Sequence, residues 1–299
     1  MTRILVAAAI VAVIASHAYA QTPRGTDASS IPRTAAGKPD LTGVWQGGST
    51  QPGAWAEANA GTGVGGSGRD PLAAVVGSSN DRPAGREGAP YQDWAAQKVL
   101  EAFNRRGVDD PTGKCLPAGI PRSVMLGLFP QQFVQTPTQL VILYEYMSTF
   151  RVIPFGAEHP DDMLPSYMGN SVASWDGDTL VVDVVGFNDK TWLAGTGTFH
   201  SDALHIVERY TRVSKDRIDY EVTMQDPNVL TKPWVLRSSL MLREATRLQE
   251  YVCAENNLDL DRYERAERAG VCGIGRLRQR IAKGALAPAV GQRTDDRLL

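Results

Sequence analysis

The chain has 299 residues and a formal net charge of −2. This charge provides no basic field that could hold nucleic acid or anionic lipid, so neither is expected as a partner. The length is enough for one large β domain, or two small ones, with a sizeable core.

The first twenty residues are typical of a secretory signal peptide. Arg3 supplies a positive charge, an apolar run follows from Ile4 to Ala15, and Ala18-Tyr19-Ala20 forms the small-x-small pattern of a cleavage site. Such a run is too short to cross a bilayer, although an uncleaved anchor is the alternative. We therefore expect a mature protein that begins near Gln21, carries no membrane span, and is periplasmic or secreted.

Three cysteines follow the predicted signal peptide: Cys115, Cys253 and Cys272. In an oxidising compartment two of them can form a disulfide and leave one thiol, and the sequence leaves all pairings open. Because no C-x-x-C spacing occurs, a metal site built on these cysteines is not expected.

Composition divides the mature chain into segments. Residues 21–90 are rich in Gly, Ser, Thr and Pro, and they predict a flexible lead-in with a first strand at Leu41–Gln46 and a Gly-rich surface loop at 47–90. Residues 91–257 predict the folded domain. Residues 258–299 predict a helical and loose C-terminal tail.

Helical spacing of apolar residues occurs at both ends of the predicted domain. Tyr91–Arg106 fits one amphipathic helix, and Gly107 is a suitable residue to end it. Residues 258–280 are charged and favour a short C-terminal helix, and residues 283–299 predict a loose end.

Short segments rich in Val, Ile, Tyr and Thr, separated by turn residues, predict strands from about residue 131 onward. They are Phe133–Thr136, Leu140–Met147, Phe150–Pro154, Ser171–Trp175, Thr179–Val185, Ala203–Val213, Arg217–Gln225, Val235–Arg243 and Leu248–Cys253.

The connections between these strands are too short for helical crossovers, so neighbouring strands should pair antiparallel. Asp176-Gly177 predicts a tight hairpin turn, since the turn needs positive φ. So many consecutive strands must hide their edges. We therefore predict a mainly β fold, an antiparallel meander that forms a barrel or strongly curved sheet with one N-terminal and one short C-terminal helix. A sandwich is the alternative.

Gly43-Val44-Trp45 on the first predicted strand resembles the G-x-W motif of the lipocalin-like (calycin) barrels. The resemblance implies an eight-stranded barrel with a ligand cavity, whose closed end is plugged by Trp45. One departure is that about ninety residues separate Trp45 from the next clear strand. Lys38–Trp45 and Asp226–Trp234 also resemble exported bacterial proteins of unassigned activity.

The mature chain has three histidines, His159, His200 and His205, which all lie within a short stretch. Histidine is the usual proton carrier near neutral pH, so His200 and His205 are candidate catalytic bases, with Glu208 or Asp202 as the partner. In a regular strand His200 and Glu208 face one side and His205 the other, unless a loop extends as far as Asp202. We expect no metal.

Two carboxylates lie on predicted strands that are otherwise apolar. Glu208 follows Leu204 and Ile206 on one face, and Glu145 is the one charge in Leu140–Met147. A desolvated carboxylate can exchange protons near neutral pH, so Glu208 is a candidate catalytic residue and Glu145 a candidate ligand-binding residue. Pairing with Arg151, Arg209, Arg237 or Arg243 would instead make such a carboxylate structural. Asp183 is expected to face solvent.

Aromatic side chains in the β region could line a pocket for an apolar ligand. The candidates are Tyr144, Tyr146, Trp192, Tyr210 and Trp234. His159, oriented by Asp161 or Asp162, and Glu145 would fix polar groups of the ligand.

These residues leave three functions open. The first is an exported barrel that binds a small, mainly apolar or aromatic molecule. The second is an acid–base enzyme on the same scaffold, a lyase, isomerase or hydrolase without an organic cofactor. The third is an envelope protein that contacts a partner through residues 47–90. The sequence does not decide whether the protein is an enzyme, and it does not predict the oligomeric state.

Overall fold

The structure is a computed structural model. Its described residues are 31–47, 89–104, 110–125, 127, 129–193, 197–255, 257 and 265. The predicted signal peptide, nearly all of the predicted Gly-rich loop and nearly all of the predicted C-terminal helix lie outside these residues, so they stay predictions.

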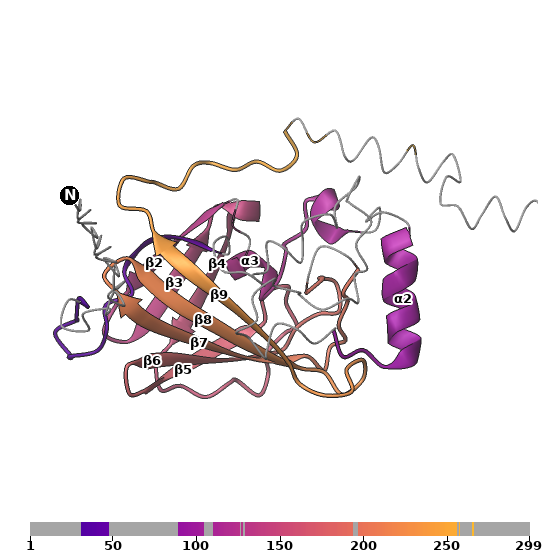
Figure 1. Cartoon of the computed structure of the whole chain (residues 1–299), viewed down its shortest axis with the longest axis horizontal. Helices are drawn as coiled ribbons and strands as arrows, with labels where there is room; N and C mark the ends of the chain where they lie inside the picture. Colours follow the sequence, from indigo (N-terminus) through magenta and orange to yellow (C-terminus); the bar gives the residue numbers. More distant parts are fainter. Residues whose placement is uncertain are drawn as a thin grey trace, which may run out of the picture.

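A nine-stranded sheet forms the body of the protein. Its strands are β1 (Gly43–Gly47), β2 (Pro130–Gln135), β3 (Gln139–Tyr144), β4 (Thr149–Pro154), β5 (Asn170–Asp176), β6 (Thr179–Val185), β7 (His205–Ser214), β8 (Arg217–Gln225) and β9 (Trp234–Leu242). The helices are α2 (Asp93–Asn104) and α3 (Arg122–Met125), and the 3₁₀ turns are η3 (Pro111–Lys114) and η4 (Tyr146–Ser148). Figure 1 shows the strands curving around a common interior, with α2 beyond one end. The predicted antiparallel barrel with an N-terminal helix is confirmed.

The barrel has a seam between β4 and β5. The sheet order is β4-β3-β2-β1-β9-β8-β7-β6-β5, and every hydrogen-bonded pair of strands is antiparallel. An odd number of strands cannot alternate in direction around a closed ring, so β4 and β5 must run parallel. They meet at the parallel bridge between Phe155 and Ala173, where Gly156 N donates to Ala173 O over 2.7 Å. Residues 155–169, the β4–β5 connection, carry the chain back across the barrel.

The strands follow the alternation of the sequence. In β6, Leu180, Val182 and Val184 are buried and the residues between them face outward. The β5–β6 hairpin pairs Asp176 with Thr179, so its turn residues are Gly177 and Asp178, one position later than predicted. Gly177 has φ of +59°, a conformation that glycine adopts without a steric cost.

The predicted strand at Leu248–Cys253 is wrong. This segment is irregular, because β9 already pairs with β1 on one side and β8 on the other and leaves no free edge for another strand. Side chains hold the segment instead. Ser148 Oγ donates to Tyr251 O over 2.7 Å, and Gln249 N donates to Glu145 Oε2 over 2.7 Å.

Strand ends also differ from the predictions in ways that matter for the candidate site. The strand predicted at Leu140–Met147 ends at Tyr144, because the chain turns into η4 and Met147 has φ of +61°. The strand predicted at Ala203–Val213 begins at His205. Glu145 is therefore in a turn, and the residues before His205 are in a loop.

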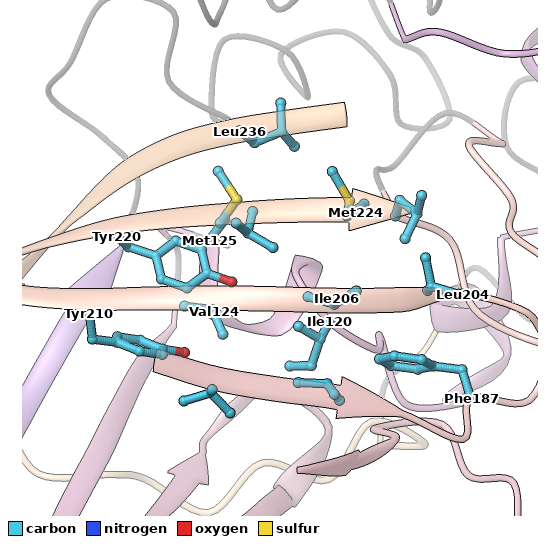
Figure 2. Close-up of a cluster of buried hydrophobic side chains, with 14 of the residues drawn as sticks. Ile120, Val124, Met125, Phe187, Leu204, Ile206, Tyr210, Tyr220, Met224 and Leu236 are labelled. Carbon is cyan, nitrogen blue, oxygen red and sulfur yellow. The ribbon is translucent and has the colours of Figure 1, made fainter. Parts of the chain in front are cut away.

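Side chains of α3 and of the residues just before it occupy one end of the barrel interior. Ile120, Val124 and Met125 are buried, and Figure 2 shows them among inward side chains of the surrounding strands. Gln131 Nε2 donates to Val124 O over 2.9 Å, and a Cβ on Gly47 would lie 2.5 Å from Val124 O. The calycin resemblance implies eight strands and a ligand cavity, whereas the barrel has nine strands and α3 fills this part of the interior.

Trp45 is buried where the segment before β1 meets the barrel. Its Nε1 donates to Leu41 O over 2.9 Å, and the Arg212 guanidinium lies 5.1 Å from the centre of its ring. Arg212 also donates to the backbone carbonyls of Asp40, Ser214 and Lys215. This cluster fixes the entry of the chain into β1.

Cys115 and Cys253 form a disulfide, which is one of the pairings that the sequence left open. A disulfide is consistent with an oxidising compartment outside the cytoplasm. Cys272 lies outside the described residues. Among the described residues, we find no helix whose length and apolar character would let it cross a membrane.

Removal of the disulfide should lower stability without changing the fold. The bond joins residues 138 positions apart, so its loss frees a long loop in the unfolded chain. We expect the Cys115→Ser/Cys253→Ser variant to lose roughly 2–5 kcal/mol of unfolding free energy in guanidinium titrations. Reduced wild-type protein is the control and should lose the same amount. A loss below about 1 kcal/mol would contradict the structural role given to this bond.

Candidate functional site

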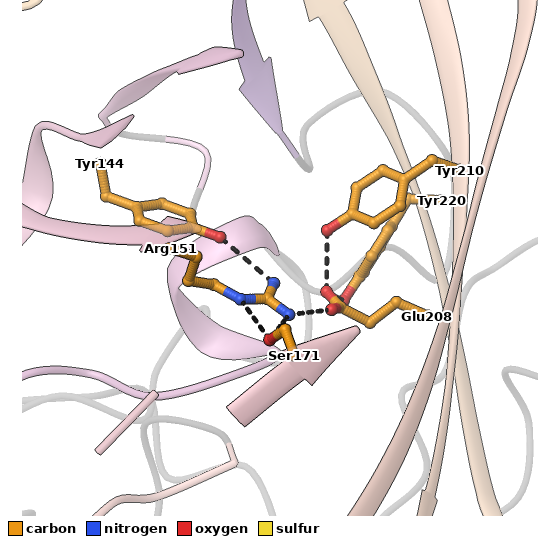
Figure 3. Close-up of polar contacts among 6 residues, drawn as sticks. All are labelled: Tyr144, Arg151, Ser171, Glu208, Tyr210 and Tyr220. Carbon is orange, nitrogen blue, oxygen red and sulfur yellow. Dashed lines mark hydrogen bonds and ion pairs between the residues drawn. The ribbon is translucent and has the colours of Figure 1, made fainter. Parts of the chain in front are cut away.

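A buried polar network lies at the centre of the barrel (Figure 3). Glu208 of β7 and Arg151 of β4 form an ion pair with 2.5 Å between Oε2 and Nη2, and their side chains are 0% and 2% exposed. Arg151 also donates to Ser171 Oγ from Nε over 3.2 Å and from Nη2 over 2.8 Å. Tyr210 and Tyr220 donate to Glu208 Oε1 over 2.8 and 2.9 Å.

The network joins β4 to β5 through side chains. These two strands meet at the seam, where few backbone hydrogen bonds connect them. Arg151 lies on β4 and its partner Ser171 on β5, so the guanidinium joins the parallel edges of the barrel. The arrangement satisfies most donors and acceptors of both charged groups, which is the condition under which a buried ion pair is tolerated. Glu208 is thus on a mainly apolar face, as the sequence indicates, and its contacts are structural.

Electrostatics in the network keep its other groups protonated. Burial raises the pKa of Tyr144 to about 12, and the Glu208 charge adds to this effect while Arg151 opposes it. Burial, followed by the Glu208 charge, raises the pKa of Tyr210 and Tyr220 well above the usual range. Burial is the largest single effect on Arg151 and disfavours its charged form, but the Glu208 charge and hydrogen bond together with Tyr144 and Tyr210 outweigh it, so the pKa of Arg151 is raised.

His200 lies in a different part of the structure. It is buried in the loop before β7, with Nε2 2.6 Å from Thr191 Oγ1 and Nδ1 2.8 Å from Ser201 O. Nδ1 faces a carbonyl and therefore donates, so Nε2 accepts from the threonine hydroxyl. Burial lowers the pKa of His200, partly offset by the hydrogen bond to Ser201 and by the Asp226 charge. These contacts describe a neutral histidine that holds the loop.

His159, Asp183 and His205 come together on the outside of the barrel. His159 Nε2 lies 2.9 Å from Asp183 Oδ1, and His205 Nε2 lies 2.6 Å from Asp183 Oδ2. His159 Nδ1 lies 2.7 Å from Asn170 Oδ1. The Asp183 and His205 side chains are 40% and 38% exposed, and His159 is more buried. We call these four residues the His–Asp–His site.

Strand register brings the four residues together. Asp183 is outward on β6 opposite Val207 of β7, so His205 is a diagonal neighbour two positions away on the same face. Asn170 begins β5, and the β4–β5 connection delivers His159 to this end of the sheet.

Gly169 permits the close approach of this connection to β6. It has φ of +67°, and a Cβ there would lie 2.7 Å from Val184 Cγ1. A larger residue would therefore push the connection away from the strand that carries Asp183.

The geometry determines where the protons lie. A carboxylate only accepts hydrogen bonds, so both imidazole Nε2 atoms that face Asp183 carry a proton. In neutral His205 the remaining Nδ1 then has a lone pair, and no hydrogen-bond partner for it occurs among the residues that the structure describes. Partial burial favours a protonated Asp183, but the hydrogen bonds from His205 and His159 outweigh it and lower the pKa of Asp183. Asp183 therefore stays ionised through the neutral range.

Histidine and carboxylate side chains can also bind metal ions. Within the described ranges, no group of three or more His, Cys, Asp or Glu side chains is arranged to hold a metal ion. In the His–Asp–His site the imidazoles of His159 and His205 instead bond to the Asp183 carboxylate.

The remaining candidate residues are scattered. Asp202 is exposed in the loop before β7, and Glu145 accepts from Gln249 N near η4. Tyr146 stacks on Phe129 with 4.9 Å between ring centres. Tyr144 and Tyr210 belong to the central network, whereas Trp192 and Trp234 are buried outside it. The predicted set therefore does not form one pocket.

Sequence reasoning missed the roles of Asp183 and Asn170. It expected Asp161 or Asp162 to orient His159, and it placed Asp183 in solvent. A usable signal existed, because Asp183 and His205 both fall on outward positions of consecutive predicted strands. The contact between His159 and Asp183 could not be predicted from strand alternation. It depends on the path of the β4–β5 connection, which is set by how β4 and β5 meet at the seam.

When compared with known proteins, the chain matches no family model and has no significant similarity to a curated protein.

Removing one partner of the central ion pair should lower the unfolding free energy strongly, and removing both charges should lower it less. We expect Arg151→Met to lower the unfolding free energy by roughly 3–5 kcal/mol, because it leaves a buried carboxylate unpaired. Arg151→Met/Glu208→Gln should recover much of this loss, since the amide oxygen can still accept from the tyrosines. Urea titrations measure both. Arg209→Met, which breaks the exposed pair with Asp176, should cost about 0–1 kcal/mol. Equal losses for Arg151→Met and Arg209→Met would refute the assignment.

Alkaline pH should destabilise the barrel through its buried tyrosines. The pKa of Tyr144 is raised from 10.0 to about 12 on folding, so its contribution to stability is full below pH 10 and is lost as pH rises toward about 12. We expect the melting temperature to fall across this window, with phenolate absorbance of the buried tyrosines appearing together with loss of near-UV dichroism. Ionisation of all tyrosines well before any structural change would contradict this prediction.

Proposed function

We propose that this chain is an exported protein of the periplasm or cell exterior that performs acid–base chemistry on a small molecule at the His–Asp–His site. The observation that carries the proposal is the His205 imidazole, whose Nε2 is bound to a carboxylate. Its side chain is 38% exposed, and its Nδ1 has no hydrogen-bond partner among the described residues. This is the arrangement of a general base whose tautomer and orientation are held by a carboxylate. The reaction class is that of a lyase, isomerase or hydrolase that needs no organic cofactor.

In this proposal His205 takes a proton at Nδ1. Asp183 accepts the hydrogen bond from Nε2–H of His205 and stabilises the imidazolium that forms. The proton abstracted from the substrate therefore stays on His205 until it is returned to product or solvent. The lowered pKa of Asp183 supports this role, because the carboxylate remains negative at neutral pH.

His159 acts as a positioning residue on the far side of the same carboxylate. It binds Asp183 Oδ1 and is itself held by Asn170, so it fixes the plane of the carboxylate that His205 uses. Its greater burial and its bonds at both nitrogens leave it less able than His205 to exchange protons with a substrate.

A proton-abstraction probe tests the proposal. The compound 5-nitrobenzisoxazole opens when a base removes its C–H proton, and the product is coloured. We expect the wild-type protein to accelerate this reaction, His205→Gln to reduce the rate by roughly 10–100-fold, and Asp183→Asn by about tenfold. His159→Gln should have the smaller effect of a positioning residue.

Asp176→Asn is the matched control. Asp176 is an aspartate on the same outer face that pairs with Arg209 and does not belong to the site, so its loss should leave the rate unchanged. Circular dichroism should show each variant folded. Equal rates for wild type and His205→Gln in folded proteins would refute the proposal.

A second function, binding of a small apolar or aromatic molecule, is favoured by an aromatic cluster beside α2. Trp94 is 54% exposed, and its ring centre lies 5.9 Å from that of Phe199. Lys98 Nζ lies 4.0 Å from the centre of the Phe199 ring, on which Tyr91 also stacks. An exposed indole over a rigid aromatic base is suited to stacking with a flat ligand.

Fluorescence quenching by 2-naphthol tests this second function. Saturable binding that weakens about tenfold in Trp94→Ala, but not in Trp175→Ala at the β5–β6 hairpin, would support it. The two functions are independent, since His205→Gln should not change this affinity. Quenching that does not saturate, or that is equal in both tryptophan variants, would reject it.

A further inference from the structure

The free nitrogen of His205 is directed toward one particular neighbouring strand. Nε2 is bonded to Asp183 of β6, and the sheet order places β6 on one side of β7 and β8 on the other. The two nitrogens of an imidazole lie on opposite sides of the ring, so Nδ1 points away from Asp183, across β7 toward the outer face of β8. A substrate that gives its proton to Nδ1 would therefore lie over β8.

Gln225 is the residue of β8 that lies directly opposite His205, and its side chain is exposed on the same outer face. The Cβ atoms of such cross-strand neighbours are about 5 Å apart, so the amide can reach a molecule that contacts the imidazole. The amide NH₂ group can donate two hydrogen bonds, and it donates none to another described residue. Gln225 thus offers a donor beside the nitrogen that accepts the proton.

The surface next to these two residues is uncharged. Val207, Thr223 and Val235 form the adjacent outward row across β7, β8 and β9, and all three are half-buried. In the row beyond it the Glu221 carboxylate is paired with Arg237. Two valines and a hydroxyl favour an uncharged, partly apolar molecule, because a charged group would lose hydration there without gaining a partner.

We propose that the substrate of the His–Asp–His site is an uncharged carbonyl compound, which Gln225 selects by donating from its amide to the carbonyl oxygen. This inference rests on the acid–base function proposed above. A hydrogen-bond donor beside a base stabilises the negative charge that develops on oxygen when a proton leaves the carbon next to a carbonyl group.

The step balances without a further reactant. The C–H bond next to the carbonyl breaks and its proton binds His205 Nδ1. The electron pair of that bond forms the C=C bond of an enolate, while the carbonyl π pair moves to the oxygen that Gln225 binds. Return of the proton from His205 to a carbon of the enolate then gives the product and restores the free base.

Hydrogen exchange of 2-tetralone in heavy water tests the inference, because this uncharged ketone has acidic C–H bonds next to its carbonyl group. Proton NMR follows the loss of their signal. We expect the full mature chain to accelerate the exchange, and Gln225→Met to reduce the acceleration roughly 10–100-fold, since one donor to the forming oxyanion is lost. The charged ketone 4-oxopentanoate should exchange at the background rate.

Gln132→Met is the matched control, since it makes the same change on the outer face of β2, away from β7 and β8, and should leave the exchange rate unchanged. Gln225 is exposed, so its substitution should leave the melting temperature close to that of the wild type. Equal acceleration of 4-oxopentanoate and 2-tetralone would overturn the assignment of an uncharged substrate.

The two proposals can fail separately. A chain that opens 5-nitrobenzisoxazole through His205, but exchanges 2-tetralone at the background rate or equally fast with Gln225→Met, would overturn this inference and leave the proposed function intact. Rates that do not depend on His205 in either reaction would overturn both.

Discussion

The barrel depends on the buried pair between Arg151 and Glu208. Nine strands cannot close as an alternating ring, so one junction must lack the antiparallel ladder that holds the others, and here it falls between β4 and β5. Arg151 crosses that junction to Ser171 and ends on Glu208 of β7. A buried pair is often no better than well-packed apolar side chains, yet its cost on being broken is high. The pair between Arg151 and Glu208 matters here for geometry, because it fixes β4 and β5 as the two edge strands that meet.

The same constraint explains why a site exists on the outer face. Because β4 and β5 run parallel, the chain must return across the barrel between them, and a tight hairpin cannot do this. The β4–β5 connection makes the return and carries His159 to Asp183 and Asn170. A barrel with an even number of strands would need no such return. The parity of the sheet therefore links the closure of the core to the assembly of the His–Asp–His site.

Much of the fold could be predicted from the sequence. In β8, for example, inward apolar residues alternate with outward polar residues over the whole length of the strand. The strand at 248–253 was predicted wrongly because local composition favours a strand, whereas tertiary pairing leaves no edge for one. α3 was missed because four residues give no helical period, and its role depends on the space left inside the barrel. The partner of Cys115 was also beyond the sequence, because pairing depends on how chain segments meet in space.

The candidate site was harder to predict, because a carboxylate among apolar residues can be a structural charge rather than part of a site. Sequence reasoning looked for a carboxylate among apolar residues, and Glu208 fits that description. A fully buried carboxylate must be compensated by the fold, however, and Arg151, Tyr210 and Tyr220 use its acceptor capacity. Asp183 on the surface needs less compensation, and its two oxygens bond to the imidazoles of His159 and His205. In this barrel the deeply buried carboxylate, Glu208, is compensated by the core of the fold, and the partly exposed carboxylate, Asp183, is compensated by two histidines on the outer face.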